Sequence, residues 1–265
     1  MVHNLKEFLQ EHQNTFAKLS DDLGLCSLVE HDIDTVNAKP IEQPPHRPPL
    51  ASGKAEDDLI DYMLTAVVNE LSESPLALPV CLVKKPDGAY RFCVNYRRVN
   101  AVSKQDAFLI PDIRDVLDSL RDMKYYATID LLSGYWQLGM TDQAKERSAF
   151  CTRRGLFHFN RMPFGLSGAP VTFCRRMQKV LKDQLCKICL FYLDDVIVYA
   201  KTHRELSERL NTVISVLGQA GLKVKPSKCT FFKTRISFLG HVVSEQGVDP
   251  QPEKIEAIHP YIEIL

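Results

Sequence analysis

Three aspartates, each at the end of a short apolar segment, are the residues of this sequence whose types and spacing point to chemistry. Asp194 and Asp195 are adjacent and separate the apolar runs 188–193 and 196–200, and Asp130 lies near the end of the run 125–131. Such runs, bounded by polar residues, predict β-strands. An Asp-Asp pair is then expected to form a two-residue hairpin turn, where Asn-Gly or Asp-Gly is strongly favoured.

The charge of the Asp-Asp pair is as unfavourable as its turn chemistry. Two like charges about 4 Å apart repel by on the order of 4 kcal/mol at an effective dielectric constant near 20. A sequence that breaks a local rule in this way often does so at a functional site. The alternative for the dipeptide alone is an exposed turn whose acids face water, so the rest of the chain must decide.

The order of the surrounding elements predicts that the three aspartates converge. The expected elements are a strand at 125–131, a hairpin of 148–152 and 156–160 turning at Arg154-Gly155, a helix at 168–184, two strands around Asp194-Asp195, a helix at 204–219 and a last strand at 222–226. With the hairpin set aside as an insertion, this order is β-α-β-β-α-β, the split βαβ of ferredoxin-like folds. The first two strands then run parallel, one strand apart, and their carboxyl ends share one edge of the sheet.

Three clustered carboxylates without nearby basic side chains require a cation. No histidine lies in these segments, so the ligands are oxygen atoms, which favours Mg²⁺ or Mn²⁺ over zinc. Two such ions about 3.5–4 Å apart can activate an attacking oxygen and stabilise a leaving one. This is phosphoryl-transfer chemistry.

Asp130 alone could instead be the N-cap of a helix over 131–138.

Composition limits the class of protein. The chain has 265 residues, of which 45% are hydrophobic and 25% charged, enough for a substantial core. No apolar run approaches the roughly 18 residues of a membrane span, and the N-terminus lacks a signal-peptide core. We therefore expect an intracellular protein, cytoplasmic or nuclear, without a membrane partner. The eight scattered cysteines are typical of reduced thiols, and Cys186 and Cys189 lack a second pair at zinc spacing.

The net charge of zero is the sum of two unlike parts. Residues 1–75 carry 5 Lys and Arg against 14 Asp and Glu, whereas residues 76–265 carry 28 against 19. Basic residues cluster in 222–244, which has no acid, and in 82–98, where only Asp87 opposes them. A solvated charged face is the ordinary explanation of one such run. Two uncompensated runs favour a polyanionic partner such as nucleic acid.

The first half of the chain has a simpler pattern. Five prolines in 40–49 predict an extended linker. Apolar residues at helical spacing predict a helix over 60–71. Strands are expected at 79–85 and 89–96, joined by the turn Lys85-Pro86-Asp87-Gly88, and Pro111 is expected to open a short helix.

Several motifs resemble those of one family. Tyr192-Leu193-Asp194-Asp195 resembles the Tyr-x-Asp-Asp box of reverse transcriptases. The segments 128–131 with 133–137, 91–97 and 161–166 look like motifs of gypsy-type LTR retrotransposon polymerases, and Phe238-Leu239-Gly240-His241 resembles the segment that holds the primer terminus. The likeness runs in order from about residue 5 to about residue 258. The chain therefore resembles the reverse transcriptase of a gypsy-type LTR retrotransposon Pol polyprotein.

The resemblance implies an α+β right-hand polymerase with a ferredoxin-like palm and a fingers subdomain. The implied divisions are an acidic leader and Pro-rich linker (1–49), fingers (50–108 and 139–163), palm (109–138 and 164–245) and the start of a thumb that is largely absent (246–265). The implied activity is RNA-directed DNA polymerisation, the addition of dNMPs to a primer 3′-OH. The implied partners are an RNA or DNA template with its primer and dNTPs; the oligomeric state is not indicated.

The resemblance also implies residue roles. Asp130, Asp194 and Asp195 would hold two Mg²⁺ ions, for which Mn²⁺ can substitute, with help from the Leu131 carbonyl. The remaining roles are Lys228 as the proton donor to pyrophosphate, Lys85 and Arg91 as triphosphate ligands, Tyr135 as the aromatic gate under the sugar, Phe164 beside the nucleotide, and Tyr192, Gly240 and His241 at the primer or template. For Tyr135 the alternative is a core aromatic, and for Lys85 and Arg91 a solvated hairpin.

Two positions depart from the family pattern. Asn95 stands where the family usually has Asp, and Gly168 where it usually has Asn. The thumb, connection and ribonuclease H segments expected beyond residue 258 are not present in the sequence, nor is an Asp-Thr-Gly protease motif. The alternatives to a polymerase are a truncated or domesticated nucleic-acid-binding remnant without catalysis, and a nucleotide cyclase on the same palm. The fingers hairpins and the segment 161–165 argue against the cyclase.

Overall fold

The structure, a computed structural model, describes residues 2–36, 38–45, 52–86, 88–108 and 112–251. These residues form two compact units. Unit 1 comprises residues 1–19, 109–132 and 177–265, and unit 2 comprises 20–108 and 133–176. Residues 46–49 of the expected linker, Asp87, Pro111 and the segment from 252 onward lie outside the described residues. The expected division into fingers, palm and thumb stays a prediction.

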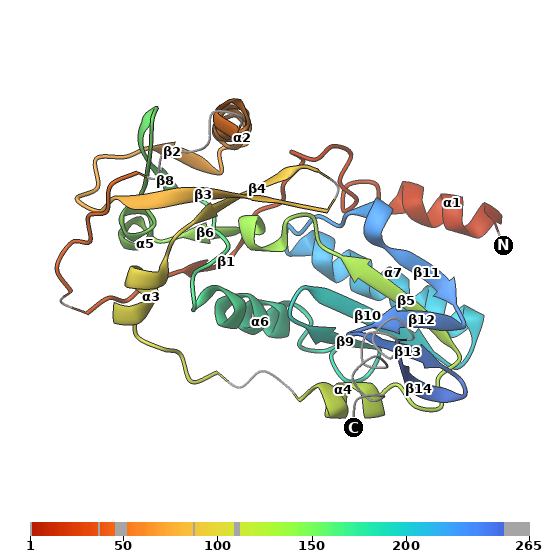
Figure 1. The fold of residues 1–265 in the computed structure, drawn as a ribbon. Helices are drawn as coiled ribbons and strands as arrows, with labels where there is room; N and C mark the ends of the chain where they lie inside the picture. The colour runs from red at the N-terminus through yellow and green to blue at the C-terminus, as the bar shows by residue number, and fades with distance from the viewer. Residues whose placement is uncertain (1, 37, 46–51, 87, 109–111, 252–265) are drawn as a thin grey trace, which may run out of the picture. The chain divides into compact units, whose positions relative to one another are not determined.

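Unit 1 is built on a four-stranded sheet in the order β11-β5-β10-β9, shown in Figure 1. Its strands are β5 (Tyr125–Asp130), β9 (Cys189–Tyr192), β10 (Asp195–Ala200) and β11 (Thr230–Lys233). β10 is antiparallel to both β5 and β9, so β5 and β9 run parallel with one strand between them. This is the arrangement expected of a ferredoxin-like sheet, and it confirms that the carboxyl ends of β5 and β9 share an edge.

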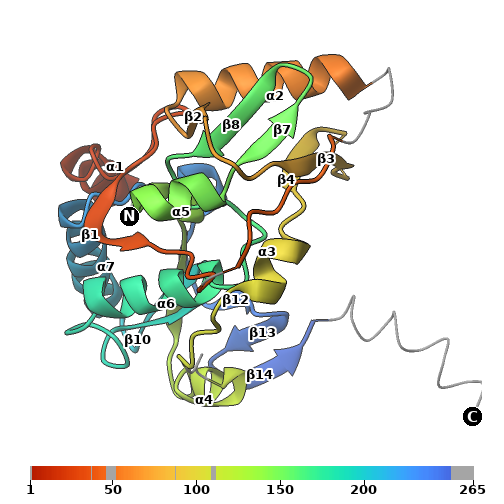
Figure 2. The same ribbon diagram turned by 90° about the vertical axis from the view of Figure 1, so that its left-hand side faces the viewer.

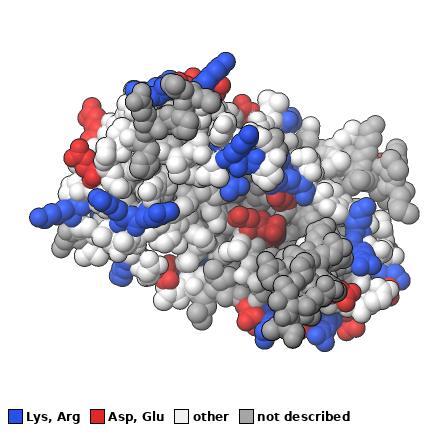
Figure 3. Space-filling model, viewed as in Figure 1, with Lys and Arg blue, Asp and Glu red and all other residues white. Residues whose placement is uncertain are grey.

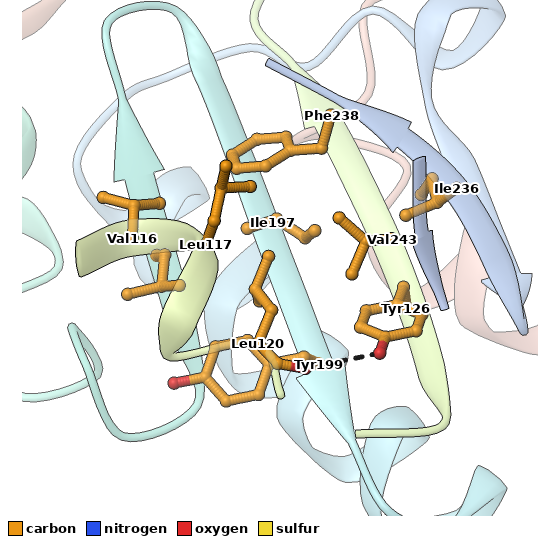
Figure 4. Packing of buried hydrophobic residues seen from close by; sticks show 10 residues of the cluster. Val116, Leu117, Leu120, Tyr126, Ile197, Tyr199, Ile236, Phe238 and Val243 are labelled. Carbon is orange, nitrogen blue, oxygen red and sulfur yellow. Dashed lines mark hydrogen bonds between the residues drawn. The ribbon is translucent and has the colours of Figure 1, made fainter. Parts of the chain in front are cut away.

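The two faces of this sheet are covered differently. α7 (His203–Gln219) packs on β5 and β10, with its predicted apolar residues Leu206, Leu210, Val213 and Leu217 buried. The opposite face belongs to a core cluster with α4 (Ile113–Asp118) and a three-stranded sheet of β12 (Arg235–Phe238), β13 (His241–Ser244) and β14 (Gly247–Pro250). Figure 4 shows the cluster, whose members include Leu120, Tyr126, Ile197, Phe238 and Val243.

The remaining elements of unit 1 are short. α1 (Val2–Glu11) opens the chain, and a 3₁₀ turn, η3 (Pro226–Lys228), precedes β11. The prediction of a strand at 222–226 was wrong. Val224 makes only isolated bridges, and the fourth strand of the sheet is β11. Leu222 and Val224 are buried and belong to a connecting segment between α7 and η3.

Unit 2 contains a five-stranded sheet in the order β2-β8-β7-β3-β4. The strands are β2 (Asn69–Leu71), β3 (Leu78–Lys84), β4 (Tyr90–Val94), β7 (Phe150–Thr152) and β8 (Gly155–Phe159). Both predicted hairpins are confirmed, β3–β4 and β7–β8. The turn of the second is Arg153-Arg154, and Gly155 opens β8 opposite Thr152. Figure 2 shows α2 (Gly53–Thr65) beside β7 and β8, where Arg153 and Arg154 pair with Asp57 and Asp61.

The helix expected over 60–71 begins and ends earlier in the chain than predicted, because α2 begins at Gly53. α2 ends at Thr65, Val67 has a φ of 53°, and Asn69–Leu71 is strand β2. The other elements of unit 2 are β1 (Cys26–His31), paired in parallel with β6 (Leu138–Met140), α3 (Arg97–Val102), η2 (Gly134–Gln137), α5 (Asp142–Arg147) and most of α6 (Ala169–Val180). None of the described helices is long and apolar enough to cross a membrane.

Candidate active site

Asp130 and Asp195 are directly opposite each other on neighbouring strands. Asp130 ends β5, Asp195 begins β10, and the two are register partners. Residues opposite each other in an antiparallel pair point to the same face, with Cβ atoms about 4.5–5.5 Å apart. That face is the one of Tyr126 and Ile197, on the side away from α7. Like charges directly opposite are destabilising, so the fold maintains an unfavourable pair at this edge.

The Asp-Asp hairpin turn differs from the expectation by one residue. Tyr192 pairs with Asp195, so the two loop residues are Leu193 and Asp194, and Asp195 belongs to β10. Leu193 has a φ of 52°, a region that costs a branched L-residue roughly 1–2 kcal/mol. Strained backbone of this kind clusters at functional sites. The strain places Asp194 in the turn and leaves Asp195 paired on the strand.

Lys228 contradicts the expectation that the acids lack a nearby base. Its Nζ atom lies 3.2 Å from Oδ2 of Asp130, with side chains 58% and 25% exposed. Lys228 ends η3, the short turn that leads into β11, the sheet neighbour of β5. The basic run 222–244 was visible in the sequence. The contact was not, because it depends on β11 lying beside β5.

The carboxyl groups of the hairpin have altered acidity. Partial burial raises the pKa of Asp194, although the residue as a whole is exposed, and the charges of Asp195 and Asp130 raise that pKa further. The pKa of Asp195 is also raised, first by burial and then by Asp130, and Lys228 lowers it in part. The repulsion shows that the three carboxylates sense one another electrostatically. Figure 3 shows acidic side chains gathered at the surface over the end of this sheet.

The chemistry of these groups fits a divalent cation, but they do not form a closed cage. Within the described part of the chain, no group of three or more His, Cys, Asp or Glu side chains is arranged to hold a metal ion. The carboxylates of Asp130, Asp194 and Asp195 nevertheless supply the hard oxygen ligands that Mg²⁺ takes. The Lys228 ammonium already forms an ion pair with Asp130, one of the three carboxylates. Asp130, Asp194 and Asp195 are therefore the residues that could hold such an ion.

The main-chain neighbours of the triad are also fixed. The Lys225 N–H donates to the Asp130 carbonyl oxygen at 2.9 Å. Leu131 is buried and forms an antiparallel bridge with Val224. Asp130 caps no helix, because the next helical turn is η2, which begins at Gly134. Burial raises the pKa of the neighbouring Cys229 thiol to about 11, so the thiol stays protonated at neutral pH.

The hairpin predicted to hold the primer lies in the same unit. β12 and β13 pair with Phe238 opposite His241, and the loop residues Leu239 and Gly240 have φ values of 50° and 75°. Positive φ at both positions is typical of type I′ turns, which favour glycine. His241 Nδ1 lies 3.1 Å from the Leu239 carbonyl oxygen. Because a carbonyl only accepts, this nitrogen carries the proton. Leu239 and Tyr192 both pack against the core cluster of unit 1.

The predicted nucleotide ligands belong to unit 2. Tyr135 is buried in η2, with ring centroids 4.9 Å from Phe164 and 5.2 Å from Phe173. Phe164 is 43% exposed. Tyr135 therefore has the packing of a core aromatic and also supports an exposed ring. These roles stay predictions.

Lys85 and Arg91 lie on the β3–β4 hairpin. The Lys85 N–H donates to the Ala89 carbonyl oxygen at 2.8 Å, which closes the turn. Arg91 is exposed and opposite Val83. Of the two departures from the family pattern, Asn95 accepts the Arg97 N–H at 3.3 Å. A side chain at Gly168 would contact His31.

Comparison with known proteins agrees with the fold and the motifs. The family described as reverse transcriptase (RNA-dependent DNA polymerase) matches residues 83–243. The retrovirus-related Pol polyprotein from transposon 297 of Drosophila melanogaster is 34% identical, over 97% of this chain and 25% of that protein. The corresponding polyprotein from transposon gypsy is 29% identical, over 97% and 26%. The chain thus spans about a quarter of the length of these relatives.

Solved structures share the fold. The foamy viral protease-reverse transcriptase in complex with RNA/DNA hybrid superposes with a TM-score of 0.88 at 24% identity, over 96% of this chain and 34% of that one. The native prototype foamy virus protease-reverse transcriptase gives 0.82 at 25% identity, over 90% and 32%. The α+β right-hand polymerase fold is thereby confirmed, and the chain belongs to the reverse transcriptase (RNA-dependent DNA polymerase) family, as a domain like those of retrotransposon Pol polyproteins.

Proposed function

We propose that this domain is an RNA-directed DNA polymerase that adds dNMPs to the 3′-OH of a primer. The observation that carries the proposal is the register pair of Asp130 and Asp195, with Asp194 in the adjoining turn and Lys228 at 3.2 Å from Asp130. Carboxylates of this kind at a sheet edge serve phosphoryl transfer when they hold two divalent ions.

The residues divide the work by their chemistry. Asp130, Asp194 and Asp195, with the Leu131 carbonyl, are the proposed ligands of two Mg²⁺ ions, for which Mn²⁺ can substitute. When bound, these ions supply the positive charge that phosphoryl transfer needs. Lys228 holds a proton on Nζ beside Asp130 and is the proposed donor to the leaving pyrophosphate. The contact at 3.2 Å places the Lys228 Nζ atom next to a proposed metal ligand.

The remaining roles concern binding. Lys85 and Arg91, on the β3–β4 hairpin, are the proposed triphosphate ligands, since cationic side chains bind phosphate through charge-assisted hydrogen bonds. Tyr135 and Phe164 are the proposed surface for the incoming sugar and base. Tyr192, Gly240 and His241 are the proposed primer contacts, and the rigid type I′ turn at Leu239-Gly240 supports that role.

A primed nucleic acid is the proposed partner. The foamy viral proteins of the same fold are described in complex with RNA/DNA hybrid and with double-stranded DNA. The two basic runs of this chain supply complementary charge. Binding through several phosphate contacts should weaken steeply as salt rises. All eight cysteines are free, which supports an intracellular, reducing site of action.

Primer extension on an RNA template tests the proposal. Wild-type protein should extend a DNA primer with dNTPs and Mg²⁺, chelation should stop extension, and Asp194→Asn should abolish it. If the wild type and Asp194→Asn extend equally, the assignment of the site is wrong.

A non-catalytic binding protein is the second candidate. It is favoured by the absence, among the described residues, of a preformed metal cage. It predicts salt-sensitive binding of primer–template with no extension under any divalent ion. The same assay, paired with a binding titration, separates the two candidates.

A further inference from the structure

The segment that carries Lys228 is held between two strips of backbone. On one side, the Leu132 N–H donates to Lys223 O at 3.0 Å and the Lys225 N–H donates to Asp130 O at 2.9 Å. On the other side, the Val224 N–H donates to Thr15 O and the Ala17 N–H donates to Val224 O, both at 2.8 Å. Val224 therefore uses both its N–H and its carbonyl oxygen toward residues 15–17, while its neighbours Lys223 and Lys225 bond to Leu132 and Asp130.

Side chains fix residues 8–17, here called the N-terminal strap, to the same region. Phe8 and Phe16 lie 6.3 and 6.4 Å from Phe231, with edge-on geometry. Phe231 belongs to β11, three residues after Lys228. In Figure 1, α1 lies beside β11. The strap thus contacts the strand on the far side of Lys228 as well as the segment before it.

The strap also docks on α7. His12 is buried and shares a hydrogen bond with the Asn211 side chain. Thr15 is buried against Gly218, where an added methyl group would overlap the Thr15 hydroxyl. Gly218 lies inside a helix, where alanine is normally favoured over glycine by about 1 kcal/mol. Close approach of the strap is the local reason for glycine at this position.

The strap lies outside the part of the chain that the family matches, residues 83–243. The sequence places it in an expected acidic leader and linker of residues 1–49, yet residues 1–19 belong to unit 1. A segment that follows α7 and has only isolated bridges is free to shift unless its second edge is covered. The strap covers that edge.

We propose that the N-terminal strap is a positioning element that holds the 222–228 segment so that Lys228 stays beside Asp130. This inference rests on the proposed polymerase function for its catalytic consequence, but the structural half stands alone. Residues 15–17 act through Lys228 and make no contact with substrate in the proposal.

Hydrogen exchange tests the structural half in the full-length protein. Gly218→Ala should displace Thr15 and speed exchange of the Val224 and Ala17 amides by tenfold or more. Thr15→Ala restores room for the methyl group, so Gly218→Ala/Thr15→Ala should return exchange to near the wild-type rate. Thr212→Ala, on the exposed face of α7, is the matched control and should change neither amide. Unchanged exchange in Gly218→Ala would overturn the proposal.

Single-nucleotide addition tests the catalytic half. Gly218→Ala should lower the rate of incorporation several-fold, with little change in KM for primer–template, and Thr15→Ala should restore it in the double variant. In a Lys228→Ala background, Gly218→Ala should cause no further loss, because residues that act through one group are not additive. Equal losses in both backgrounds would mean a general structural defect and would overturn the positioning role.

The experiments distinguish a failure of the proposed polymerase function from a failure of the strap proposal. If the wild-type chain does not extend a primer, the proposed function fails while the exchange data still decide the strap. If it extends but the strap variants are additive with Lys228→Ala, the function stands and the strap inference is wrong.

Discussion

Both units keep charged or titratable groups where ordinary packing disfavours them, but unit 1 keeps them at its surface and unit 2 keeps them inside. In unit 1, Asp194 and Asp195 are exposed, and burial and the charge of Asp130 raise the pKa of both. In unit 2, Arg176 is 1% exposed, and among the described residues its guanidinium group interacts with the Cys26 thiol and has no oxygen partner.

The second interior group of unit 2 is His31. It is 2% exposed, bonds Thr172 Oγ1 through Nδ1 at 2.8 Å, and its pKa is lowered by burial to about 4. Burial also lowers the pKa of Arg176, and the Cys26 thiol offsets part of this effect. Charges at a surface remain available to a ligand. Buried charged groups such as Arg176 affect the stability of the fold. Mutations of the surface groups should therefore change activity and leave stability nearly unchanged, and mutations of the buried groups should change stability.

Outside the three aspartates, the largest expected effect is at Lys228. Lys228→Ala should lower the single-turnover rate of dNMP addition by about 10²–10⁴-fold, the usual contribution of a general acid, and leave the melting temperature nearly unchanged, because exposed ion pairs contribute little. Lys228→Arg keeps the charge but releases a proton less readily, so its rate should lie between those of the wild type and Lys228→Ala. A rate for Lys228→Ala within threefold of wild type would remove Lys228 from the mechanism.

The pH dependence of stability should come from His31. Its folded pKa of about 4 lies below its ordinary 6.5, so its contribution is fully present above pH 6.5 and is lost as pH falls through 4. The loss is about 3 kcal/mol. His31→Gln keeps a polar group near Thr172 but cannot take the proton. Urea denaturation at pH 7 and pH 4 should show a smaller drop for this variant; identical drops would show that His31 does not titrate in this way.

Replacing the enclosed charge should stabilise the protein. Arg176→Met exchanges a buried cation, whose interaction is with the Cys26 thiol, for an apolar chain of similar length. Replacing buried charged groups by apolar ones gains on the order of 1–4 kcal/mol. Thermal unfolding should therefore shift upward by several degrees. Arg175→Met is the matched control, because Arg175 is exposed and paired with Asp106 at 2.7 Å, and it should gain nothing. A lower melting temperature for Arg176→Met would show that Arg176 has a partner that stabilises it.

The smallest effect is expected at Leu193. Leu193→Gly relieves a positive φ and should gain up to about 1 kcal/mol, reduced by the extra freedom of glycine in the unfolded chain. If the strain positions Asp194, primer extension should fall while stability rises. A variant that is no more stable than wild type would mean that the turn carries little strain.

The convergence of the aspartates was predictable because it follows from element order. The runs 125–131 and 188–200 have the length and composition of strands, and a split βαβ leaves one topology for them. The position of the turn was not predictable to the residue. Strand ends are set by backbone pairing, here Tyr192 with Asp195, and side-chain patterns do not reveal that register.

Elements that depend on tertiary contacts were missed. The segment 222–226 was expected to be a strand, but it forms isolated bridges at Val224, whereas Thr230–Lys233 completes the sheet. The helical spacing of apolar residues continues to Leu71. The helix nevertheless ends at Thr65, because the chain turns at Val67, which has a positive φ. Likewise, nothing in an acidic N-terminal segment indicates that Phe8 and Phe16 pack on Phe231.

The central claim is that the carboxylates at the end of the unit 1 sheet are the reaction centre. It is tested most directly by single-nucleotide addition with Asp195→Asn, beside Asp183→Asn as an exposed control. Loss of incorporation by at least 10³-fold in Asp195→Asn, with wild-type rates in Asp183→Asn and an undiminished melting temperature in both, is the predicted result. Incorporation by Asp195→Asn at the wild-type rate would contradict the account.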